Sequence, residues 1–408
     1  MNNKNLKKNF LWNTIGVGFN SFTSLFYMII VTRINGSDIA GVFTFAFSFA
    51  LLLEVIGQYS GRAFQVSETN KKITDSDYVY NRIICSIIMI IVSLVFSFIR
   101  SYDSYKFILI MLLVLFRAVE SIGDSLFGVI QKNDDLYKVG ISFFIKSILN
   151  VSLFLIIDLL THNLIISCLV ILIIQTLITL FYDLRNVLKY NFKFNSFNKD
   201  NMKYVFKTGL YTFIFLILTQ YLVGAPKYII DYYLPNTDQT IFGIISMPAS
   251  VMLMFAALSI QPCLTTLIEY LKEKQYNQFE KLVFKIISFV SILGVIGTLF
   301  CYFFGTQILS IIYGLDLTMY KLELAIVLIA ATLYSIVSIL SSALITMRKT
   351  GMQDVMFGIG SVYAFISSII LIKNYNLFGS YISYITTMFI IFIMFIIYFK
   401  YIISKIKK

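Results

Sequence analysis

Residues 107–128 read FILIMLLVLFRAVESIGDSLFG, a wholly apolar run followed by a stretch that holds Arg117, Glu120 and Asp124. A helix of about 20 residues rises about 30 Å, which is the thickness of the hydrocarbon core of a bilayer. The run therefore predicts a membrane-spanning helix. A charge at the centre of such a helix costs roughly 2.5–3.5 kcal/mol, so these three charged side chains are expected to face protein or water rather than lipid.

The rest of the chain repeats this apolar pattern. Of its 408 residues 58% are hydrophobic and only 13% are charged, which is typical of an integral membrane protein. We predict an all-α membrane protein with about twelve spans, the first of them an uncleaved N-terminal helix. The predicted spans are 10–32, 39–60, 82–100, 106–130, 138–158, 163–182, 204–224, 239–262, 283–304, 322–346, 352–372 and 377–401.

The basic residues indicate how these spans are oriented. Most of the 33 Lys and Arg residues fall in alternate connections and at the two ends of the chain. The other side of the membrane receives only Arg33, Arg100, Lys106, Lys227, Lys321 and Lys373. Basic residues favour the cytoplasmic side, so both termini are predicted there, in the bacterial cytoplasmic (inner) membrane. The net charge of +12 thus reflects topology, and no nucleic-acid partner is expected.

The longest basic connection, 185–207 (RNVLKYNFKFNSFNKDNMKYVFK), divides the chain into nearly equal parts. We predict a six-helix lobe over residues 1–190 and a second over 191–408, related as a parallel repeat. Residues 35–48 (NGSDIAGVFTFAFS) and 236–250 (NTDQTIFGIISMPAS) are weakly similar, and each opens the second helix of its half.

Several chemistries lack the residues they need. His162 is the only histidine, and each of the four cysteines stands alone in an apolar segment. Neither a histidine-based catalytic triad nor a metal site can be assembled, so we expect no catalytic residue, no metal and no bound cofactor.

The charges inside the predicted spans are Glu54, Arg117, Glu120, Asp124 and Lys146. At about 100° per residue, Arg117, Glu120 and Asp124 share one stripe of their helix, roughly 60° wide. Two interpretations remain open. In the structural one, Arg117 pairs with Glu120 and Lys146 with Asp124, which only holds helices together.

In the functional interpretation the same stripe lines a central aqueous cavity. Arg117 and Lys146 then bind an anionic substrate, while Glu54, Glu120 and Asp124 provide charge balance or couple transport to H⁺ or Na⁺. Arg33 and Lys227, near the outer ends of their helices, are more often interface anchors than gates.

Residues 8–50 (KNFLWNTIGVGFNSFTSLFYMIIVTRINGSDIAGVFTFAFSFA) and 61–68 (GRAFQVSE) resemble the start of bacterial O-antigen and capsule repeat-unit flippases of the Wzx type. These belong to a superfamily that also contains multidrug and toxin extrusion antiporters. The resemblance implies translocation of undecaprenyl-diphosphate-linked oligosaccharides from the inner to the outer leaflet, by alternating access of two six-helix lobes. It implies a cationic central cavity, with Arg117 and Lys146 as cation candidates in the first lobe and Arg33 and Lys227 near the outer mouth.

Other functions compete with this expectation. A cation-coupled multidrug antiporter of the same superfamily needs an acidic cavity, and the charges inside the spans do not decide between the two. A polysaccharide polymerase or ligase is disfavoured because such enzymes carry a large outer loop, and the outer loops here are short. For a flippase the expected partners are the lipid-linked oligosaccharide, membrane lipid, and a polymerase and chain-length regulator.

Overall fold

The computed structural model describes residues 3–190 and 192–407, with side chains from residue 7 onward. All regular structure in the described residues is helical, which confirms the predicted all-α class. The chain divides into two compact units, Met1–Gln220 and Tyr221–Lys408, which we describe separately. Residue 191, where the predicted second lobe begins, lies outside the described residues, and a lobe boundary at 190 stays a prediction.

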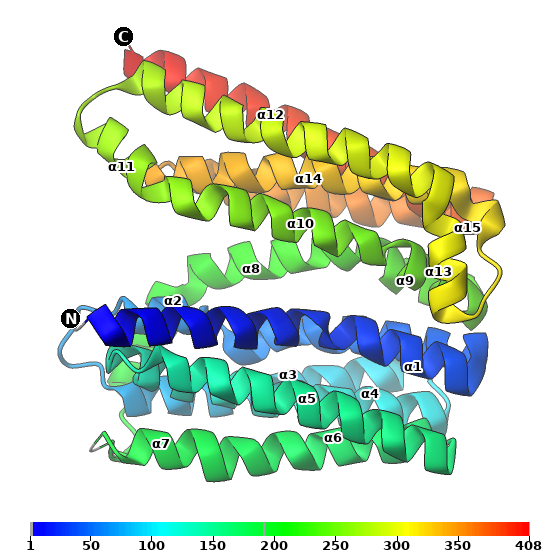
Figure 1. Ribbon diagram of the computed structural model, residues 1–408. Coiled ribbons are helices and arrows are strands. Elements are labelled where there is room, and N and C mark those ends of the chain that lie inside the picture. Colours follow the sequence, from blue (N-terminus) through cyan, green and yellow to red (C-terminus); the bar gives the residue numbers. More distant parts are fainter. Residues whose placement is uncertain (1–2, 191, 408) are drawn as a thin grey trace. The chain divides into compact units, whose positions relative to one another are not determined.

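The first unit is a bundle of helices that run alongside one another (Figure 1). Its elements are α1 (Asn3–Gln58), α2 (Gly61–Val66), α3 (Asp75–Ile99), α4 (Ser104–Lys132), α5 (Leu136–Thr161), α6 (Leu164–Ile178), a π-helical turn (Thr179–Leu184), α7 (Arg185–Leu188) and the first part of α8 (Lys199–Tyr233). Gly36 interrupts α1 with φ 83° and ψ 174°, a conformation that favours glycine because it has no Cβ.

The second unit begins within α8. It continues with α9 (Asn236–Ile245), α10 (Met247–Ile260), a 3₁₀ turn (Gln261–Cys263), α11 (Leu264–Lys272), α12 (Tyr276–Phe300), a π-helical turn (Cys301–Gly305), α13 (Thr306–Tyr313), a second 3₁₀ turn (Thr318–Tyr320), α14 (Lys321–Thr346) and α15 (Gly351–Lys407). Asn376 interrupts α15 with φ 51°.

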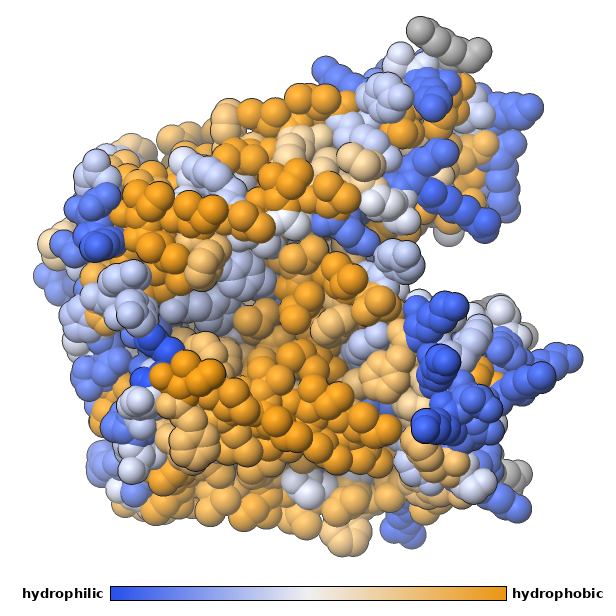
Figure 2. Space-filling view, turned by 180° about the vertical axis from the view of Figure 1, so that it is seen from behind, coloured by the Kyte–Doolittle hydropathy of each residue, from blue (hydrophilic) through white to orange (hydrophobic). Residues whose placement is uncertain are grey.

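The chain is a multi-pass membrane protein. Nine helical segments in its described part are long and apolar enough to cross a bilayer. Two of them, Lys7–Val66 and Gly351–Lys407, contain the interruptions at Gly36 and Asn376. Apolar side chains form broad areas along the helices, and hydrophilic residues gather at the helix ends (Figure 2). The predicted number of about twelve crossings stays a prediction.

Close packing of α1 on α5 fixes one wall of the first unit. A Cβ atom built on Gly16 would lie 2.0 Å from the carbonyl oxygen of Gly140, and one built on Gly140 would lie 2.2 Å from that of Trp12. Both glycines are therefore required by the approach of the two backbones. Gly18 lies two residues after Gly16 in α1, and a Cβ atom built on it would meet open space.

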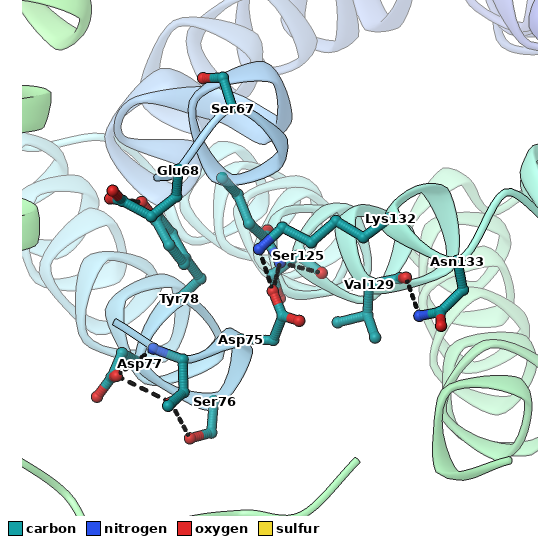
Figure 3. A network of polar contacts seen from close by, with 12 residues as sticks. Ser67, Glu68, Asp75, Ser76, Asp77, Tyr78, Ser125, Val129, Lys132 and Asn133 are labelled. Carbon is teal, nitrogen blue, oxygen red and sulfur yellow. Dashed lines mark hydrogen bonds and ion pairs between the residues drawn. The ribbon is translucent and has the colours of Figure 1, made fainter. Parts of the chain in front are cut away.

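A polar network joins α2, α3 and α4 at one end of the first unit (Figure 3). The Asp75 carboxylate accepts hydrogen bonds from Lys132 at 2.7 Å and from the Gln65 amide at 3.3 Å. The Gln65 amide also donates to the backbone carbonyl of Ser125 at 3.1 Å, and the Tyr78 hydroxyl donates to Glu68 at 2.8 Å. These contacts hold the short helix α2 against the end of α4.

Candidate functional site

A polar cavity lies inside the first unit, between α1, α4, α5 and α6. It consists of two adjoining chambers of about 190 Å³ and about 150 Å³. Both chambers are lined by Asn20, Arg117, Glu120, Lys146 and Gln175. Glu54 and Asp124 line the smaller chamber only. The structure therefore brings together five of the side chains that the sequence placed inside the membrane.

Arg117 is the centre of one charge cluster. Its Nη1 atom lies 2.5 Å from Glu120 Oε2 and 3.4 Å from Glu54 Oε2. The guanidinium also lies over the ring of Phe47, 4.7 Å from its centroid, a cation–π geometry. Glu54 accepts a further hydrogen bond from Gln58 at 2.7 Å. The Arg117–Glu120 contact predicted from helical spacing is confirmed.

Lys146 belongs to a second cluster. Its ammonium group lies 2.6 Å from Asp183 Oδ2 and 3.0 Å from the Thr179 hydroxyl, and the side chain is 5% exposed. The alternative in which Lys146 pairs with Asp124 is wrong, because both partners of Lys146 come from the π-helical turn that follows α6. Asp183 is fully buried, which makes this pair the most enclosed ion pair that the structure records.

Asp124 belongs to a third cluster, at the junction of α2, α3 and α4. Its Oδ1 atom lies 3.8 Å from Arg62 Nε. Arg82 is completely buried in α3 and donates to the Asn81 side chain at 3.1 Å. Arg82 is the first residue of the predicted span 82–100, and the structure buries it inside the bundle.

Arg33 and Lys227 are not among the lining residues of this cavity. Arg33 is exposed near the interruption of α1, and Lys227 is half-buried in α8, within the second unit. Their predicted role near an outer mouth stays a prediction.

Sequence reasoning missed several residues of the site. Asp183 directly follows the predicted span 163–182, a position typical of a residue at the membrane–water interface. Asn20, Asn150 and Gln175 are uncharged, yet Asn150 donates to Gln175 at 3.0 Å and Asn20 lines both chambers. The signal that could have found them is the rarity of amides inside apolar helices.

The charges of the cavity do not balance around Arg117. Glu54 and Glu120 face a single guanidinium group, whereas Lys146 and Asp183 compensate each other. The Arg117 cluster thus holds two carboxyl groups against one guanidinium group.

Comparisons with known proteins fit a helical membrane bundle of this kind. No family model matches the chain. Among curated proteins, the capsular polysaccharide biosynthesis protein CapF of Staphylococcus aureus is 24% identical over 387 residues, which cover 91% of this chain and 94% of that protein. Among solved structures, the lipid II flippase MurJ in its inward closed conformation superposes with a TM-score of 0.76 at 14% identity, covering 96% of this chain and 87% of MurJ.

The chain has the fold of the MOP-superfamily transporters. An inward-facing multidrug resistance MATE family transporter of that superfamily superposes with a TM-score of 0.69 at 13% identity, over 95% of each chain. An outward-facing MATE transporter gives 0.62 at 15% identity, over 99% of this chain and 96% of that one. These structures belong to transporters and a flippase and not to enzymes, in agreement with the sequence analysis.

Proposed function

We propose that this protein is a flippase for lipid-linked oligosaccharides. It moves undecaprenyl-diphosphate-linked repeat units from the inner to the outer leaflet of the cytoplasmic membrane, for assembly of a capsule or O-antigen. The observation that carries the proposal is the charged cavity around Arg117, in a chain with the fold of a lipid II flippase. Its similarity along nearly its whole length to a capsular polysaccharide biosynthesis protein favours capsule as the product.

Arg117 is the group best placed to bind a diphosphate. A guanidinium group binds phosphate and carboxylate oxygens with the same planar, two-pronged geometry. A diphosphate oxygen that takes the place of Glu120 therefore keeps Arg117 compensated. Asn20, Asn150 and Gln175 add uncharged hydrogen-bonding groups that suit sugar hydroxyls.

The carboxylates released from Arg117 provide a means of coupling. When an anion occupies Arg117, Glu54 and Glu120 lose their counter-ion and take up H⁺ or Na⁺; when the anion leaves, Arg117 compensates them again. Alternating access then exchanges the two occupants on opposite sides of the membrane. In this proposal both termini are cytoplasmic, and a polymerase and chain-length regulator act on the delivered repeat unit.

Complementation tests the proposal. A bacterial strain that lacks repeat-unit translocation is given the wild-type chain, Arg117→Ala or Lys146→Ala, and surface polysaccharide is measured at matched protein level in the membrane. Wild type is expected to restore polymer and Arg117→Ala to abolish it. Surface polymer at the wild-type level in both variants would remove the cavity from the mechanism. Exchange of the exposed Lys71 for alanine is the control for loss of one positive charge.

The excess of carboxylates around Arg117 favours a second candidate, a cation-coupled multidrug antiporter, since a cationic drug needs an acidic cavity. The same strains distinguish the two functions. Resistance to cationic dyes that is lost in Glu54→Gln and Glu120→Gln, without restored surface polymer, identifies the antiporter.

A further inference from the structure

The contact between α1 and α5 changes in character along its length. At one end Gly16 and Gly140 bring the two backbones together. Next, Phe19 packs edge-on against Phe144, with ring centroids 4.9 Å apart. Further along, Tyr27 packs on Phe154, also with centroids 4.9 Å apart. Between these two aromatic contacts lie the small residues Thr23 of α1 and Ser147 of α5, which line the same groove.

A groove of about 140 Å³ lies at this small-residue stretch, on the exterior of the first unit. It is lined by Phe19, Thr23, Phe26, Ser147, Ile148, Val151 and Ser152. Phe19, Phe26 and Ile148 are 50%, 48% and 38% exposed. The outer part of the groove is therefore apolar and open to the surroundings of the unit.

The floor of the groove is shared with the polar cavity. Thr23 and Ser147 line the groove on one side and the larger chamber on the other. Their hydroxyls donate within their own helices, to the backbone carbonyls of Asn20 and Phe143, both at 2.7 Å. Neither of these bonds crosses from α1 to α5, and the two small side chains lie between the apolar groove and the chamber that holds Arg117.

We infer that this groove binds the isoprenoid chain of the lipid-linked substrate, next to the diphosphate. An apolar groove beside a charged cavity is complementary to an amphiphile with an anionic head and a hydrocarbon tail. Thr23 and Ser147 then mark the place where head and tail meet. The inference rests on the proposed function, and it places the tail against one unit, in the seam between α1 and α5.

Photo-crosslinking tests this placement. The full-length protein in phosphatidylcholine vesicles is exposed to a polyprenyl diphosphate that carries a diazirine near the diphosphate, and adducts are mapped by mass spectrometry. We expect adducts in residues 19–26 and 147–152. A diazirine-bearing phosphatidylcholine is the second probe, and equal labelling of the same residues by it would show a general lipid contact and overturn the inference.

Variants that fill the groove sharpen the test. Ser147→Phe and Thr23→Leu, one on each helix, are expected to lower the isoprenoid adduct about tenfold, because overpacking at a binding surface excludes the ligand. Leu149→Phe is the matched control, since Leu149 is exposed on the same helix and does not line the groove. Thermal unfolding confirms that each variant is folded. Unchanged labelling in both groove variants would also overturn the inference.

The labelling readout is independent of the proposed function. If complementation depends on Arg117 but the groove is not labelled, the proposed flippase function is supported and the assignment of the groove to the isoprenoid chain is wrong. If the chain fails to restore polymer, the proposed function is wrong whatever the labelling shows.

Discussion

At the scale of single residues, the most demanding feature is the buried pair of Lys146 and Asp183. Removing one partner of such a pair leaves an uncompensated charge inside the helix bundle. This pair is also the part of the site that is hardest to predict from the sequence. Arg117 and Glu120 are three residues apart on one helix, so helical spacing alone predicts their contact, whereas Lys146 meets Asp183 only through the packing of α5 against the end of α6.

We expect Asp183→Asn to lower the free energy of unfolding by roughly 3–5 kcal/mol, because Lys146 loses its counter-ion inside the bundle. The double variant Asp183→Asn with Lys146→Met removes both charges and is expected to recover most of the loss. Thermal unfolding of the purified protein in detergent measures both effects. A double variant as unstable as the single one would show that packing, and not charge, makes the site sensitive.

Asp135, at the start of α5, predicts a pH dependence. Burial raises the pKa of its carboxyl group, but hydrogen bonds from Lys138 and Tyr190 outweigh burial, and the pKa lies below its ordinary value. A folded-state pKa below the unfolded one means that ionised Asp135 stabilises the fold above the unfolded pKa, near 3.9, and that this stabilisation disappears as the pH falls through the folded-state pKa.

The unfolding temperatures of wild type and Asp135→Asn are therefore expected to differ at pH 7 and to converge below about pH 4. Asp134→Asn is the matched control for the loss of one negative charge. A difference that persists undiminished in acid would mean that the Asp135 side chain acts through its shape.

At the scale of elements, the seam between α1 and α5 depends on two glycines. Gly140→Ala is expected to destabilise the first unit by roughly 1–3 kcal/mol, because the new methyl group would enter the backbone of α1. Gly18→Ala is the matched control: its methyl group meets open space, and alanine favours a helix by about 0.5–1 kcal/mol over glycine. Thermal unfolding distinguishes the two variants, and equal destabilisation would argue against close backbone packing as the reason for Gly140.

The elements themselves were largely predictable. Apolar runs of membrane length identify helices because no other regular structure satisfies its backbone within one segment in lipid. Two of the joints were also predicted in place: the predicted break at 33–38 contains the interruption at Gly36 of α1, and the predicted break at 373–376 contains the interruption at Asn376 of α15. The chain folds back at both places, because Thr44 reaches Met28 across the first interruption and Ser383 reaches Ser367 across the second.

At the scale of the whole molecule, the predicted topology is the property most open to experiment. Ser196→Cys and Thr161→Cys, in a background where the half-exposed Cys263 and Cys301 are replaced by serine, place a thiol on each predicted side. A membrane-impermeant maleimide is expected to label Thr161→Cys in intact cells and Ser196→Cys only after permeabilisation. The reverse pattern would invert the topology and exchange the inner and outer ends of the cavity.

The sequence could not have predicted how the cavity is distributed over the chain. Charge patterning identified the polar stripe of α4, and the fold places Asn20, Lys146 and Gln175 from three other helices opposite it. Those contacts arise from packing between residues far apart in the chain, which composition and periodicity do not encode. Asn20 and Gln175 carry no net charge, so charge patterning does not identify them.

The π-helical turn Thr179–Leu184 has a consequence for how this site can vary among related chains. A π turn corresponds to one residue inserted into an α-helix. Because the widened turn absorbs that residue, deleting one residue within it restores ordinary helical geometry while the helix that follows keeps its face. Asp183 lies inside the turn, so such a deletion shifts it relative to Lys146, and a change of length without any substitution can disconnect the buried pair.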